Sequence, residues 1–98
     1  MEAALEERRR ASYVLQLFVC GMGQRSAAAI ASVAAICEQW LPGRHTLQII
    51  DLQAEPGRSK VEQLVAAPTL VRKAPLPVRR VVGDLTDRLR VLRALEVS

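Results

Sequence analysis

The chain has 98 residues, half of them hydrophobic, and a net charge of +4 from 14 Lys and Arg against 10 Asp and Glu. A chain of this length forms one domain with a modest core, and it contains no run of about 18 apolar residues that could cross a membrane. The charge is too small and too scattered to indicate nucleic-acid binding by itself. Because the chain has no cleavable signal pattern and no disulfide framework, we expect a reduced protein in the cytoplasm.

The N-terminal half predicts a strand followed by a helix. Residues 1–11 carry Glu and Arg without an apolar stripe, so we expect a tail that precedes a domain at 12–98. Residues 13–19 are apolar on nearly both faces, as in an interior strand. A glycine pair breaks this strand, and we expect Ser26 to cap a helix that ends at a Pro-Gly pair. Its apolar stripe consists of Ala27, Ile30, Ala34, Cys37 and Leu41.

The middle of the chain completes a βαβ unit. Residues 46–50 predict a second strand, which the intervening helix should place parallel to the first strand. Asp51 follows as a hydrogen-bonding turn residue. Ser59 and Glu62 have the spacing of a capping box, so they predict a second, short helix. We expect this helix to pack its apolar side chains inward, namely Val61, Leu64 and Val65.

The C-terminal third predicts a hairpin and a helix. Pro68 lacks an amide hydrogen and ends the short helix, and the β-rich runs 69–73 and 78–82 predict an antiparallel hairpin. Thr86 should cap a last helix with an inward stripe of Leu85, Leu89, Leu92 and Leu95. The order β-α-β-α-β-β-α is the thioredoxin order with a mixed four-stranded sheet. Tertiary packing decides proline isomers, so the sequence makes no prediction for Pro68, Pro75 and Pro77.

Three sequence blocks carry a family resemblance. They are Ala66-Ala67-Pro68-Thr69-Leu70, Leu76-Pro77-Val78-Arg79-Arg80, and Gly83-Asp84-Leu85 followed by Asp87-Arg88. At these separations they resemble the KaiB family of circadian clock proteins, over about residues 13–96. The resemblance implies a non-enzymatic regulator without a cofactor. It also implies binding to KaiC, a hexameric ATPase whose phosphorylation and ATPase cycle the regulator modulates.

The resemblance also implies two alternative folds. KaiB-like proteins are described as metamorphic, with a monomeric thioredoxin-like state that binds the partner and a ground state that forms a tetramer. The positions that we associate with the switch are Pro68, Gly83 and Ala94. The family usually has Gly at Ala94, and Ala is favoured in a helix interior by up to about 1 kcal/mol. Leu89 replaces a capping Glu of the family, which costs about 0.5 kcal/mol in the opposite direction. We expect the thioredoxin-like form.

Partner-binding residues follow from the resemblance and from charge. The resemblance places KaiC binding on the helix after the second strand, where we expect Arg58, Lys60, Glu62 and Gln63 to be exposed. The hairpin and last helix form a basic half that suits an acidic partner surface and includes Arg79 and Arg80. The whole basic set is Arg72, Lys73, Arg79, Arg80, Arg88, Arg90 and Arg93.

Three charges of the family pattern are missing. Gln63 stands where the family often has Lys, and Ala28 replaces an Arg of the first helix. Gln48 replaces a second-strand Lys that is associated with recruiting KaiA. These departures argue against recruitment of KaiA.

Two other classes of function remain open. Cys20 before Gly21 is similar to the turn of monothiol glutaredoxins, but no second Cys follows at the spacing of a dithiol enzyme, and we expect Cys37 to be a packing residue. Nucleic-acid binding is favoured by the basic half and opposed by the lack of exposed aromatic residues on the hairpin, so it ranks last. His45 is expected in an exposed turn, and without neighbouring ligands it predicts no metal site.

Overall fold

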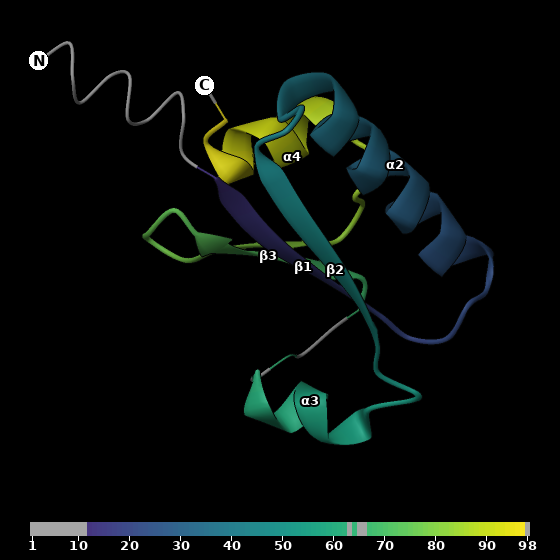
Figure 1. Ribbon diagram of the computed structural model, residues 1–98. Helices are drawn as coiled ribbons and strands as arrows, with labels where there is room; N and C mark the ends of the chain where they lie inside the picture. Colours follow the sequence, from purple (N-terminus) through teal and green to yellow (C-terminus); the bar gives the residue numbers. More distant parts are fainter. Residues whose placement is uncertain (1–11, 63, 65–66, 98) are drawn as a thin grey trace, which may run out of the picture.

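The computed structural model of the chain describes residues 12–62, 64 and 67–97. In chain order these residues form β1 (Tyr13–Val19), α2 (Gln24–Trp40), β2 (His45–Asp51), α3 (Pro56–Val61), β3 (Thr69–Ala74), β4 (Arg79–Val82) and α4 (Arg88–Leu95). The four strands make one sheet in the order β2-β1-β3-β4 (Figure 1). β1 is parallel to β2, whereas β3 is antiparallel to both β1 and β4. The predicted thioredoxin-like order and mixed sheet are confirmed.

The two faces of the sheet have separate apolar cores. α2 and α4 lie on one face, and α3 lies on the other (Figure 1). The alternation of β1 sends Leu15, Leu17 and Val19 into the larger core with α2 and α4, and sends Phe18 to the opposite side. Phe18 there packs with Ile50 and Val71, and with the half-buried Leu52 and Leu64. An interior strand with apolar residues on both faces therefore serves both cores, as predicted.

α2 begins before its predicted cap. Its N-cap is Gly23, which provides no side-chain hydrogen bond, and Ser26 lies inside the helix and is buried. The predicted stripe is also wrong in part, because Ala27 is exposed. Ser32, which was not in the predicted stripe, faces the core. Its hydroxyl donates to the carbonyl of Leu85 at 2.7 Å, so burial leaves the hydroxyl with a hydrogen-bond partner. The buried residues of α2 are Ser26, Ala29, Ser32, Val33, Ile36 and Cys37.

α3 is shifted relative to its prediction. The helix begins at Pro56, whose fixed φ suits the first helical position, and its N-cap Glu55 makes no side-chain cap. Ser59 therefore lies within the helix, and the predicted capping box does not form. The shift turns Val61 outward, so this side chain is 76% exposed rather than packed. Leu64 does pack against the smaller core, and Val65 lies outside the described residues.

The hairpin is confirmed to within one residue at each strand, whereas α4 differs in its cap and its stripe. The N-cap is Asp87, whose carboxylate accepts from the amide of Arg90 at 3.2 Å. Thr86 instead donates its hydroxyl to Asp84. Leu85 is buried, but it lies in the turn before the helix and does not begin the helical stripe. Leu89 is 65% exposed, and Val91 is the buried residue of the first turns instead.

Candidate protein-docking site

α3 presents a surface on the face of the sheet opposite α2 and α4 (Figure 1). None of its six residues is buried. Lys60 and Val61 are exposed, and Lys60 has no ion-pair partner within 4.0 Å among the described residues. The side chains of the helix itself therefore contribute little apolar packing, and its position on the sheet depends on the residues that flank it.

Glu62, directly after α3, is one of these flanking residues. Its carboxylate lies 2.7 Å from the Nζ of Lys73 on β3 and 4.0 Å from the guanidinium of Arg58. Its backbone carbonyl accepts a 2.7 Å hydrogen bond from Arg80 on β4. The side chain of Glu62 is only 13% exposed. The end of α3 is thus tied to both strands of the hairpin. Glu62 was expected to be exposed, and that prediction is wrong, whereas its role in partner binding stays a prediction.

The structure divides the six predicted partner-binding residues. Arg58, Glu62 and Arg80 come together at the end of α3, where Arg58 also pairs with Glu55 at 3.7 Å. Arg79 lies apart from them, paired with Glu96 after α4 at 2.7 Å. Lys60 remains as the exposed cation of α3, and Gln63 lies outside the described residues.

Sequence reasoning missed two residues of this site. Val61 was expected to pack inward, although Pro56 at the first helical position was a signal for an earlier helix start. Lys73 was assigned to a general basic surface, and no local pattern links it to Glu62, 11 residues away.

One predicted member of the basic surface lies in the interior. Arg72 is 2% exposed and lies on the face of β3 that α2 and α4 cover. Its guanidinium donates to the carbonyl of Leu95 at the end of α4 and, at 2.7 Å, to the carbonyl of Pro77 in the hairpin turn. It was predicted as one residue of the basic half, and an arginine is almost never fully buried unless its guanidinium has partners. In the structure its two carbonyl partners make burial possible.

The three proposed switch positions lie in the C-terminal half. Pro68 precedes β3. The peptide bonds before Pro68, Pro75 and Pro77 are all cis. Pro68 and Gly83 line the same hollow of about 260 Å³, and Gly83 has a φ of 106°, which favours glycine. Ala94 is half-buried in α4 and packs against the larger core. Their role in a switch stays a prediction.

The cysteines do not form a dithiol pair. Cys20 is exposed directly after β1, and the position three residues later is Gly23. Cys37 is buried in α2 as predicted, and burial, with a smaller contribution from Glu38, raises the pKa of its thiol to about 11. A buried, protonated thiol is a packing group rather than a nucleophile.

Asp51 and His45 both have structural partners. The carboxylate of Asp51 accepts from the amides of Gly21 and Gln53, both at 2.9 Å, so its predicted turn role is confirmed. His45 begins β2 and is half-buried, with Nδ1 2.7 Å from the carbonyl of Leu41, so the prediction of an exposed turn was wrong. Within the described part of the chain, no three His, Cys, Asp or Glu residues form a metal-binding group. No helix in residues 12–62, 64 and 67–97 has the length and apolarity needed to cross a membrane.

Comparisons with known proteins identify the family. The KaiB domain model matches residues 16–97. The chain is 38% identical over 88 residues to the circadian clock oscillator protein KaiB of Synechococcus elongatus, which covers 90% of this chain and 86% of that protein. It is 34% identical over 84 residues to the circadian clock protein KaiB3 of Synechocystis sp., which covers 86% of this chain and 82% of that protein.

Solved structures show the same fold. The N-terminal domain of Synechococcus elongatus SasA superimposes with a TM-score of 0.71 at 26% identity, over 90% of this chain and 87% of that one. Mitochondrial thioredoxin 3 of Saccharomyces cerevisiae superimposes with a TM-score of 0.69 at 9% identity, over 97% and 87% of the two chains, which is a likeness of fold alone. The family model, the identity to clock proteins and the observed sheet agree, and the chain belongs to the KaiB family of circadian clock proteins.

Proposed function

We propose that this chain is a non-enzymatic clock regulator that binds a KaiC-like hexameric ATPase in the cytoplasm and modulates its phosphorylation and ATPase cycle. Membership of the KaiB family supports a clock role, and the likeness to the N-terminal domain of SasA supports a role in protein contacts. The thioredoxin-like form is the binding form, and it acts as a monomer.

The observation that carries this proposal is the exposed surface of α3. Val61 and Lys60 offer adjacent apolar and cationic groups, and an exposed valine gains free energy when a partner covers it. The contacts of Glu62 hold α3 on the hairpin, so little conformational entropy is lost when the helix docks. Arg58 and Arg80 contribute to binding mainly by positioning this surface.

KaiA is not included as a partner. Gln48 replaces the family's Lys on β2, and its Oε1 accepts a 3.0 Å hydrogen bond from Gln16 on β1. The position therefore lacks the positive charge and uses its oxygen within the sheet.

Size-exclusion chromatography of this chain with the KaiC hexamer of Synechococcus elongatus and ATP tests the proposal. We expect co-elution at tens of micromolar, and we expect Val61→Asp or Lys60→Glu to weaken binding at least about tenfold. The matched control is Leu76→Asp in the hairpin turn, because Leu76 is 79% exposed and Val61 is 76% exposed. Absence of co-elution for the unchanged chain, or an equal loss in Leu76→Asp, would overturn the assignment of α3.

A further inference from the structure

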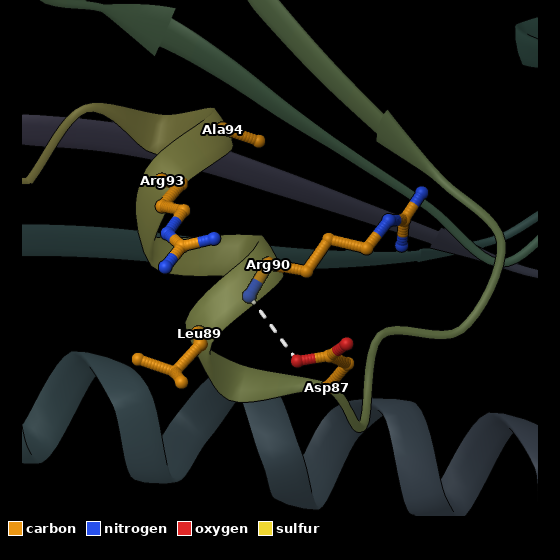
Figure 2. A pocket seen from close by; sticks show the side chains of 5 residues that line it. All are labelled: Asp87, Leu89, Arg90, Arg93 and Ala94. Carbon is orange, nitrogen blue, oxygen red and sulfur yellow. Dashed lines mark hydrogen bonds between the residues drawn. The ribbon is translucent and has the colours of Figure 1, made fainter.

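The outward face of α4 combines an exposed leucine with arginines. Val91 and Leu95 turn into the core, whereas Leu89 is 65% exposed, with Arg93 one helical turn later. Figure 2 shows Leu89 and Arg93 projecting from the same side of the helix, while Arg90 extends in the other direction. This face borders an open hollow of about 640 Å³ lined by Asp87, Leu89, Arg90, Arg93 and Ala94.

The acidic side chains around α4 are already engaged. Asp87 caps the helix by accepting from the amide of Arg90 at 3.2 Å. Asp84 accepts from the amide of Thr86 at 2.9 Å and also from its hydroxyl. Glu96 pairs with Arg79 at 2.7 Å. None of these carboxylates lies within 4.0 Å of the guanidinium of Arg88 or Arg93.

The arginines of α4 differ in how far they are engaged. Arg90 donates to the carbonyl of Val82 and, at 3.1 Å, to the carbonyl of Asp84, so its guanidinium stabilises the loop before the helix. Arg88 and Arg93 are exposed, and neither has an ion-pair partner within 4.0 Å among the described residues. The outward face therefore carries the unneutralised charge of Arg93 next to the exposed Leu89, and the exposed Arg88 adds a second such charge at the first turn of the helix.

We propose that this face of α4 is a second docking surface, which binds an acidic amphipathic segment of a protein partner. An apolar side chain of that segment covers Leu89, and its carboxylates pair with Arg93 and with Arg88 in the first turn. Carboxylates complement these charges, and a bidentate pair with an arginine adds geometric specificity. A protein segment fits better than a nucleic acid, because the lining of the hollow offers a leucine and no aromatic ring for base stacking.

The second surface is separate from α3. The two helices lie on opposite faces of the sheet (Figure 1), and the contacts of Glu62 that hold α3 do not involve α4. A chain that is bound through α3 can therefore still present Leu89 and Arg93 to a second protein. This inference does not depend on the identity of the partner at α3.

The experiment uses the whole chain and a defined probe. The probe is a fluorescein-labelled helical peptide in which Glu and Leu recur at helical spacing, and the control peptide has Lys in place of each Glu. Fluorescence anisotropy measures binding, and ¹⁵N chemical shifts locate it. We expect the acidic peptide to bind and to change the chemical shifts of the α4 amides, and we expect the Lys control peptide not to bind. We expect Leu89→Asp and Arg93→Glu each to weaken binding about tenfold.

Matched variants separate this surface from the rest of the molecule. Leu76→Asp makes the same apolar-to-acidic change at the hairpin turn, outside both proposed docking surfaces, so it should alter binding less than about twofold. Arg93→Gln, which removes charge without reversing it, guards against a folding defect. Four results overturn the proposal: equal weakening by Leu76→Asp, shifts outside α4, tighter binding of an oligodeoxythymidine, or self-association that Arg93→Glu abolishes.

Discussion

Arg72 offers the sharpest test of what holds the C-terminal half together. Its buried guanidinium joins β3 to the hairpin turn at Pro77 and to the end of α4 at Leu95. The variant Arg72→Met keeps the aliphatic volume and removes both hydrogen bonds. Each such bond from a charged donor contributes about 1.5–3 kcal/mol. Removing the buried charge also removes its desolvation cost, which is not fully offset because the Nε of Arg72 has no hydrogen-bond partner among the described residues.

The net loss of stability should be about 2–3 kcal/mol. For a domain of this size the melting temperature should fall by about 10–20 °C. Urea denaturation followed by circular dichroism measures the free energy of unfolding, and hydrogen exchange should show reduced protection of α4. The control is Arg93→Met, which removes an exposed guanidinium and should cost less than about 0.5 kcal/mol. If the two variants unfold alike, the buried bridge does not stabilise this half.

Three further outcomes follow from the contacts. Glu62→Gln removes the ion pairs that position α3 and should lower stability by about 1 kcal/mol, with faster amide exchange in α3; unchanged exchange would contradict its positioning role. At pH 8, Ellman's reagent should modify the exposed Cys20 rapidly and Cys37 only after unfolding, because burial raises the pKa of the Cys37 thiol. Cys20→Ser should leave KaiC binding unchanged. Hydrogen bonds from the Thr86 hydroxyl and amide lower the pKa of Asp84. The ionised carboxylate therefore stabilises the fold above its unfolded pKa, and this stabilisation is lost as the pH falls through the folded pKa. Thr86→Val should raise the pKa of Asp84 in an NMR titration, and no rise would contradict the assignment.

The order of elements could be predicted because its signals are local. The two-faced apolar run of β1 and the prolines around the hairpin mark element types within a few residues of sequence. The exact helix starts were less predictable, since Ser26, Ser59 and Thr86 all have capping side chains, yet Gly23, Glu55 and Asp87 are the observed caps. Capping propensity identifies residue types that suit an N-cap, but tertiary packing decides which of several neighbouring residues becomes the N-cap.

The candidate site was less predictable because it depends on contacts between distant segments. The partners of Arg72 include the carbonyl of Leu95, 23 residues away, and no sequence pattern records such a contact. The role of Glu62 likewise depends on Lys73 and Arg80, which the hairpin brings beneath α3. Charged residues were therefore assigned to the surface by composition, although two of them are held by partners that only the fold supplies.

The two faces of the sheet are stabilised by different forces, and this difference bears on function. α2 and α4 are held by a continuous apolar core that includes Leu17, Ile36 and Leu95, whose contribution changes little with salt. α3 buries none of its own side chains, and the ion pairs at its end join Glu62 to the partly exposed Lys73 and Arg58. Salt weakens such pairs more than it weakens apolar packing. The partner that we propose at α3 can therefore bind there without opening the larger core, so the sheet and the two helices on its other face stay intact.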